Sequence, residues 1–149
     1  MSRYSDFIKV VIYNNCAGPR FHLWIENICR ALFADATPAE VYPLMLKLLK
    51  LEEGPYDQLP ARGFSADYVR RETERAVAGV EGRSAIYPGI DIDIPTPPDT
   101  TRCTREGVKA AVLAAFAGGA QGVVLSRKYS EMRLDNLAGA GDAIKELAG

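Results

Sequence analysis

Apolar and polar positions along the chain predict three strands. Short runs rich in β-branched and aromatic residues occur at 6–15 (DFIKVVIYNN), 84–94 (SAIYPGIDIDI) and 122–129 (GVVLSRKY). Each run reaches a loop through polar or turn-forming residues, as strands commonly do. Proline lacks the N–H group that a strand ladder needs, so we expect the second strand to bend or bulge at Pro88.

Apolar residues at helical spacing predict helices in the remaining segments. Thr37 followed by Pro38 and Glu40 is typical of a helix start, because the hydroxyl and the carboxylate bond each other's backbone amides. Ser65 is positioned to cap the next helix. The predicted helices span 19–33, 37–53, 66–80, 107–117 and 134–147.

The order of these elements indicates an α/β fold. Strands alternate with helices, which favours parallel strands joined by helical crossovers. We expect residues 1–149 to form a single domain. Within it, residues 18–82 are predicted to form a helical insertion after the first strand.

Composition and charge narrow the class of protein. The chain is 48% apolar with a net charge of −1, as in an ordinary globular domain. It has no basic stripe, so we expect neither nucleic acid nor an anionic membrane as a partner. The N-terminal stretch MSRYSDFIKV lacks the apolar core of a signal peptide, which predicts a cytoplasmic location.

Cysteine and histidine offer little familiar chemistry. Cys16, Cys29 and Cys103 contain no CxxC pair, so neither a disulfide framework nor a zinc site is predicted. Cys16 directly follows a strand, where a nucleophile can sit. His22 is the one histidine of the sequence, which leaves little room for a Cys–His or Ser–His–Asp system.

Glycine-rich segments do not predict a cofactor. FAGGAQG precedes a strand instead of following one, and AGAGDA lies in the last predicted helix, so neither suits a dinucleotide. No Walker-type loop occurs, and the loops after the second and third strands lack the glycines that wrap a phosphate. We therefore expect no cofactor.

The stretch YPGIDIDIP raises the main functional question, because it places Asp91 and Asp93 within an apolar strand. If Ile90, Ile92 and Ile94 face the helices, the two acids face the opposite side, at the carboxyl end of the strand. Ligands of parallel α/β folds bind at these ends. The sequence therefore predicts a site around both carboxylates.

Neighbouring strands add polar side chains to the same end. We expect acids, amides, cations and tyrosines to gather there, an inventory that suits the many hydroxyls of a carbohydrate. The residues in question are Tyr13, Asn14, Asn15, Arg20, Arg127, Lys128, Tyr129 and Glu131.

Two other interpretations of the acids are open. Asp91 and Asp93 are also explained as ion-pair partners of Arg127 and Lys128, with no chemistry. Alternatively, oxygen ligands of this kind bind magnesium or calcium; the main prediction includes no metal.

Several segments resemble known families. GIDID, at 89–93, resembles the acid-rich strand of chitinase-like glycosidases, although Pro95 stands where those proteins have the catalytic glutamate. More broadly, IKVVIYNNCAGPR, GFSADYVRRET, IYPGIDIDIPTP and GGAQGVVLSRKYSEMRLDNLAGAG look like the C-terminal part of uncharacterised bacterial glycoside-hydrolase-like (β/α)8-barrel proteins. The resemblance implies a partial (β/α)8 (TIM-type) barrel with a sugar site at its strand ends.

The resemblance also implies an activity, hydrolysis of an O-glycosidic bond by carboxylates. In that interpretation Asp91 or Asp93 acts with Glu131, and Arg127 and Tyr129 orient them. Tyr13 and Asn14 would hold sugar hydroxyls.

A barrel needs eight strands, and the sequence predicts three. Either the chain is then a fragment with a missing N-terminal half, or it associates with another chain, such as a second copy of itself, to cover its open edges. The rival function is a non-catalytic carbohydrate-binding or assembly module.

Overall fold

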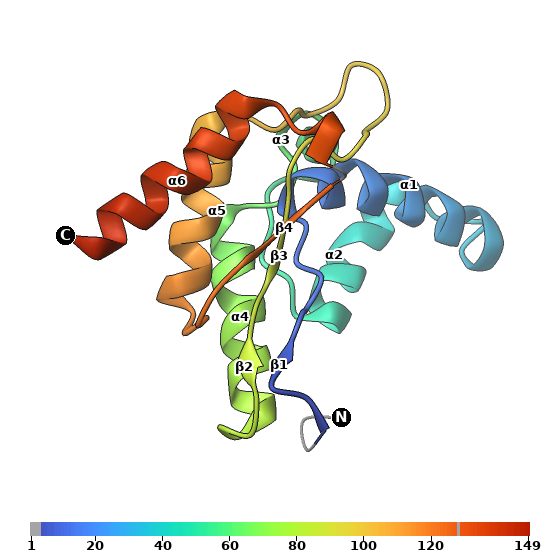
Figure 1. Cartoon of the computed structure of the whole chain (residues 1–149). Coiled ribbons are helices and arrows are strands. Elements are labelled where there is room, and N and C mark those ends of the chain that lie inside the picture. Colours follow the sequence, from blue (N-terminus) through green and yellow to red (C-terminus); the bar gives the residue numbers. More distant parts are fainter. Residues whose placement is uncertain (1–3, 128) are drawn as a thin grey trace.

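A computed structural model describes residues 4–127 and 129–149 (Figure 1). Its strands are all short, and six α-helices and two 3₁₀ helices accompany them in the described residues. In chain order the elements are β1 (Phe7–Ile8), α1 (Asn14–Leu32), α2 (Pro38–Leu49), η2 (Tyr56–Gln58), α3 (Leu59–Arg62), α4 (Ala66–Val80), β2 (Ala85–Ile86), β3 (Gly89–Asp91), α5 (Arg105–Ala117), β4 (Val124–Ser126), η3 (Tyr129–Glu131) and α6 (Leu134–Ala148).

The strands form two parallel pairs, β1 with β2 and β3 with β4. Pro88 lies between β2 and β3 and has no N–H group, so the regular ladder is interrupted there. Single contacts continue across the break: the Gly89 amide donates to the Val10 carbonyl (2.7 Å), and the Val124 amide donates to the Pro88 carbonyl (2.9 Å). The segment 85–91 therefore lies between the other two strand segments.

The partial (β/α)8 barrel expected from the resemblance is wrong. The described residues form a small α/β protein with two two-stranded parallel sheets. A barrel wall needs continuous, tilted ladders that close on themselves, whereas these ladders end after two or three residue pairs. The α/β class and the parallel direction agree with the order of elements in the sequence.

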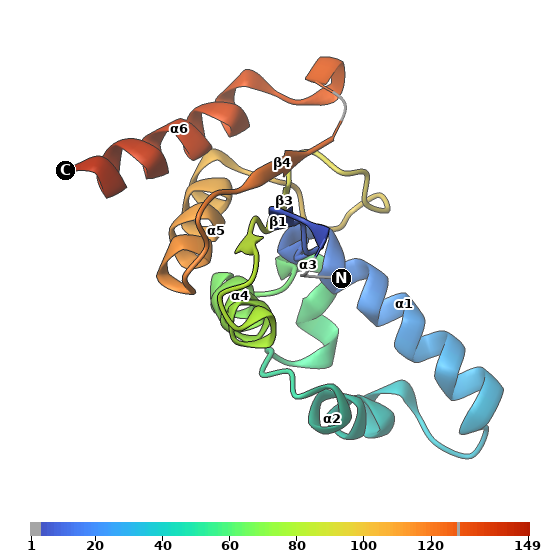
Figure 2. The ribbon, with the colours of Figure 1, turned by 60° about the horizontal axis from the view of Figure 1, so that its bottom comes forward.

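One face of the strands packs against helices α4 and α5 (Figures 1 and 2). Ile12, Ile90 and Ile92 are at most 3% exposed and pack with Val69 of α4 and Val112 of α5. These are the alternate strand positions that the sequence assigns to the helix side. Burial of such aliphatic side chains contributes about 1.5–3 kcal/mol each.

The opposite face of the strands is open to solvent around β1. Phe7 is 48% exposed and Val11 65% exposed. Phe7 stacks on Tyr87 of the next strand segment, with ring centroids 5.0 Å apart. Both faces of a parallel sheet are normally buried, so this uncovered apolar surface is unusual for the strand type.

A second core holds the helices that follow β1. Ile25 and Cys29 of α1, Tyr42 and Met45 of α2, and Phe64 beyond α3 are all buried there. Residues 18–82 of the predicted insertion thus include α2, α3, α4 and most of α1. That these residues form an insertion stays a prediction.

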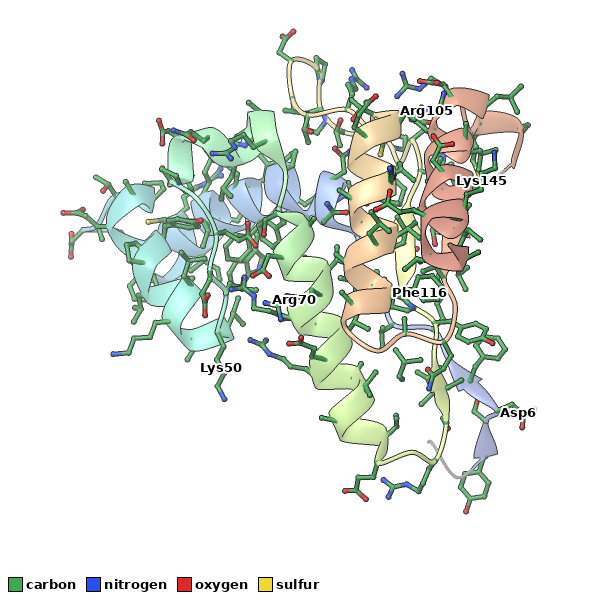
Figure 3. All side chains as sticks on the ribbon, turned by 90° about the vertical axis from the view of Figure 1, so that its left-hand side faces the viewer. Asp6, Lys50, Arg70, Arg105, Phe116 and Lys145 are labelled. Carbon is green, nitrogen blue, oxygen red and sulfur yellow. The ribbon has the colours of Figure 1, made fainter. Side chains whose placement is uncertain are left out.

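The two C-terminal helices are joined by charged pairs. Figure 3 shows α5 between α4 and α6, with Arg105 at the end of α5 that faces the start of α6. Arg105 forms a 2.6 Å ion pair with Asp142, and Lys109 forms one of the same length with Glu146. Within the described part of the chain, no helix has the length and apolar character needed to cross a membrane.

Candidate functional site

A cleft of about 570 Å³ opens beside the carboxyl end of β3. Its walls come from the start of α1, the turn between α3 and α4, the loop 95–104 and the N-terminal half of α5. The loop is held over this site by the Thr101 amide, which donates to the Pro60 carbonyl (2.7 Å). A cleft at this strand end is where parallel α/β proteins bind ligands.

Asp91 lies at the base of the cleft and is 1% exposed. Its carboxylate accepts hydrogen bonds from the backbone amides of Asn15 (3.3 Å) and Cys16 (2.7 Å) in the first turn of α1. These amides have no partner within the helix, so Asp91 acts as the cap that α1 lacks locally. Burial raises the pKa of Asp91 above its ordinary 3.8, and the two amides offset part of that rise.

Asn15 brings a donor without a partner to the cleft wall. Its side-chain oxygen accepts from the Thr101 hydroxyl (2.8 Å). Its Nδ2 atom is buried and has no hydrogen-bond partner among the described residues. Neighbouring Asn14 donates its Nδ2 to the Phe64 carbonyl (3.3 Å) and also lines the cleft. A buried amide N–H group without a partner costs about 1–3 kcal/mol.

Two arginines line the same cleft. Arg62 ends α3 and donates to the Gln58 side chain (3.0 Å), whereas Arg102 lies in the loop before α5. In the described residues, neither forms a salt bridge with a carboxylate. Asp91 is the one acid among the cleft-lining residues, so the lining has an excess of positive charge.

Asp93 faces a different part of the molecule. Its backbone has φ of 54°, a left-handed conformation that breaks the alternation of the strand. The carboxylate accepts from the backbone amide of Arg133 (2.9 Å), the Arg133 guanidinium (2.8 Å) and the Asn136 amide (2.9 Å), at the start of α6. Partial burial acts to raise the pKa of Asp93, but the bonds from Arg133 and Asn136 outweigh it and the pKa is lowered.

The remaining acid, Glu131, is paired with Arg127 at 2.6 Å. Neither residue lines the cleft beside Asp91. Lys128 falls outside the described residues, and of Tyr129 only the backbone, in η3, is described.

The other predicted contact residues lie elsewhere. Tyr13 is next to α1, and its hydroxyl accepts from the Lys9 ammonium group (3.1 Å) on the open face of the strands. Arg20 is exposed on α1. The structure thus brings together Asn14, Asn15 and Asp91 from the predicted set.

Cys16 is buried beside Asp91, at 1% exposure. Burial, followed by the nearby Asp91 carboxylate, raises the pKa of its thiol to about 12. The reactive form of cysteine is the thiolate, so this environment does not suit a nucleophile at neutral pH.

Sequence reasoning missed Arg62 and the segment 100–102, which also form the cleft. A signal for 100–102 exists, because this polar stretch follows the strand that carries Asp91 and must therefore lie near its end. Arg62 has no such signal, since it precedes that strand by a whole helix.

A metal centre has little support in the geometry. Asp91 and Asp93 bond to the starts of different helices. Among the residues that the structure describes, no group of three or more His, Cys, Asp or Glu side chains lies close enough to hold a metal ion.

Comparison with known proteins adds no relative. No protein-family model, curated protein or solved structure matches the chain.

Proposed function

We propose that the protein binds a carbohydrate in the cleft beside Asp91. The observation that carries this proposal concerns Asn15, which lines a cleft of about 570 Å³ and whose buried Nδ2 atom has no partner within the described chain. That volume falls within the range of about 300–1,000 Å³ that is usual for small-ligand sites. A sugar hydroxyl accepts a hydrogen bond from an amide and donates one to a carboxylate, so Asn15 and Asp91 suit adjacent hydroxyls.

The lining supports a small polar ligand in other ways. Thr100, Thr101 and Thr104 add hydroxyl groups, while Ala61 and Ala110 provide apolar surface for the C–H face of a sugar ring. The site lies between rigid helix starts and one loop, an arrangement that favours a preformed cleft.

Binding without hydrolysis is the better-supported form of the proposal. A glycosidase needs two carboxyl groups on either side of the scissile bond. Asp93 is tied to Arg133 and Glu131 to Arg127, which leaves Asp91 alone in the cleft. Hydrolysis by Asp91, Asp93 and Glu131 stays a prediction from the sequence.

Titration calorimetry with a panel of mono- and disaccharides tests the proposal. We expect millimolar or tighter binding by at least one sugar, and a loss of about tenfold in affinity for Asn15→Leu, the equivalent of one hydrogen bond. The matched control is Asn27→Leu, an exposed position on the same helix. If no sugar binds, or if Asn15→Leu binds as well as the wild type, the proposal is wrong.

Turnover of aryl glycosides separates binding from catalysis. We expect no hydrolysis by the wild-type protein. Hydrolysis that disappears in Asp91→Asn and Glu131→Gln would instead establish the glycosidase activity.

Assembly is the second candidate function, and the exposed strand face favours it. Phe7 and Val11 leave apolar surface uncovered on strands that are parallel and hence normally buried on both faces. We expect light scattering to detect a dimer of the wild type that Val11→Lys weakens. A monomer at all concentrations would exclude self-association, although a different chain would still fit the same face.

The proposal includes a cytoplasmic location. Cys16, Cys29 and Cys103 are free and buried, as expected of a protein in the reducing cytoplasm.

A further inference from the structure

We infer that the ligand of the cleft is an acidic sugar, a uronic acid or an oligosaccharide that contains one, with its carboxylate held by Arg62 and Arg102. This inference rests on the proposed carbohydrate function and adds the chemical class of the ligand.

The arginines of the cleft differ from most others in the chain. Arg70, Arg71, Arg75, Arg105, Arg127 and Arg133 each pair with a carboxylate of the protein. Arg62 makes one hydrogen bond, to the neutral Gln58 side chain, and Arg102 has neither an ion pair nor a side-chain hydrogen bond in the described part of the chain. A guanidinium group has five N–H donors, and the bond from Arg62 to Gln58 uses one of them.

The two arginines come to the cleft from separate elements. Arg62 ends α3, and Arg102 follows the threonines of the loop 95–104. Both are exposed, and both line the cleft that contains the unpaired Asn15 amide. A ligand with hydroxyls at Asn15 and Asp91 would therefore have another substituent near the arginines of the cleft wall.

A carboxylate fits these groups better than a phosphate does. Arginine binds carboxylates and phosphates alike through two parallel N–H···O bonds, so the other donors of the cleft decide between them. Phosphate sites commonly add backbone amides from a helix start or a glycine-rich loop. The amides of Asn15 and Cys16 at the start of α1 already bind Asp91, and the Gly107 amide at the start of α5 bonds the Thr104 hydroxyl. The loop over the cleft has prolines and no glycine, which removes the second source of amides.

Matched pairs of sugars test the inference. Glucose, galactose and mannose are each compared with the corresponding uronate and with the corresponding 6-phosphate by calorimetry on the full chain. We expect at least one uronate to bind about tenfold more tightly than its neutral partner, with a preference that shrinks as salt rises.

Single-residue variants test whether Arg62 and Arg102 hold the carboxylate. Arg62→Gln and Arg102→Gln are each expected to weaken uronate binding about tenfold while changing neutral-sugar binding little. Arg102→Lys keeps the charge but loses the planar fork, so it is expected to restore only part of the affinity. Arg30→Gln is the matched control, because Arg30 is exposed on α1 and its side chain bonds only Asn27.

Each outcome tests a different part of the inference. Neutral sugars that bind as well as uronates overturn the acidic-sugar inference and leave the proposed function in place. Sugar phosphates that bind more tightly than uronates overturn the choice of carboxylate. Uronate binding that is unchanged in both arginine variants overturns the residue assignment, and a complete absence of sugar binding removes the proposed function itself.

Discussion

Asp91 and Asp93 are two residues apart, yet they lie in opposite electrostatic environments. Asp91 is fully buried and bonds backbone amides at the start of α1, so the cost of burial dominates and its pKa is raised. Asp93 is partly exposed and bonds the side chains of Arg133 and Asn136 at the start of α6, so its pKa is lowered. The same type of side chain, two residues apart in one segment, thus serves two different helices.

The difference shows how solvent exposure and the type of partner together decide the state of a carboxyl group. At Asp91 the loss of water outweighs the bonds from the backbone amides, whereas at Asp93 the bonds from Arg133 and Asn136 outweigh a smaller loss of water. Asp91 thus holds the start of α1, while Asp93 holds the start of α6.

Removal of Asp91 is expected to have the largest effect. In Asp91→Ala the amides of Asn15 and Cys16 lose their acceptor in a buried site, which costs about 2–4 kcal/mol of unfolding free energy. Urea unfolding followed by circular dichroism measures this. Asp35→Ala, at an exposed turn position, is the control and should change stability by less than about 0.5 kcal/mol. Equal losses in the two variants would contradict the capping role.

Helices α1 and α6 each pack closely, at a glycine, against the backbone of another segment. A Cβ on Gly18 of α1 would lie 2.5 Å from the Leu59 carbonyl oxygen, and one on Gly139 of α6 would lie 2.2 Å from that of Arg105. Because backbone cannot move aside cheaply, Gly18→Ala and Gly139→Ala should each cost about 1–3 kcal/mol.

The control for the glycines lies on α6 itself. A Cβ added to Gly141 would have no heavy atom within 4 Å beyond its chain neighbours and the backbone of its own helix. Gly141→Ala should therefore stabilise the protein by up to about 1 kcal/mol through helix propensity. Thermal unfolding compares all three variants. Destabilisation by Gly141→Ala as large as that by Gly139→Ala would contradict the close-approach argument.

Neutralising Asp93 should have a smaller effect than removing Asp91. Asp93→Asn keeps an acceptor but loses the charge that pairs with Arg133, whose side chain is 60% exposed and therefore well screened. We expect a loss of about 1 kcal/mol at pH 7. The matched control is Asp99→Asn, since Asp99 is exposed and also has a positive φ of 59°.

The smallest expected effect is on the pH dependence of the unfolding free energy, to which the two aspartates should contribute in opposite directions. For Asp93 the folded pKa is lowered, so its contribution is present above the unfolded pKa of about 4 and is lost as pH falls through the folded pKa. For Asp91 the folded pKa is raised, so its contribution is present below about pH 4 and is lost as pH rises through the folded pKa.

Urea unfolding of Asp91→Asn, Asp93→Asn and the wild type between pH 2.5 and 7 measures these contributions, with the range chosen to bracket an unperturbed carboxyl pKa of about 4. The wild-type advantage over Asp93→Asn should grow with pH, and that over Asp91→Asn should shrink. Parallel curves would contradict the opposite shifts.

Local signals in the sequence predicted part of the fold well. Thr37 caps α2 and exchanges bonds with Glu40 as expected, and Ser65 caps α4. Both signals lie within a few residues of the helix that they start. The predicted start of the first helix, at residue 19, was wrong because α1 begins at Asn14 with a cap, Asp91, from a distant strand.

The candidate site shows the same limit. Alternation correctly separated Ile90 and Ile92 from Asp91, but it failed for Asp93, because a left-handed residue turns the chain there. Asn14 and Asn15 were predicted from their place after a strand. Arg62 reaches the cleft only through the packing of α3 against α1, which no local pattern encodes.

The pairing of Phe7 with Ala85 has a consequence for how the chain acquires its fold. Four α-helices and one 3₁₀ helix lie between the two residues, so this contact closes a long loop and is of high contact order. During synthesis the first strand leaves the ribosome well before its partner exists. We expect the helical segment after it to collapse early, and strand association to limit the rate of folding.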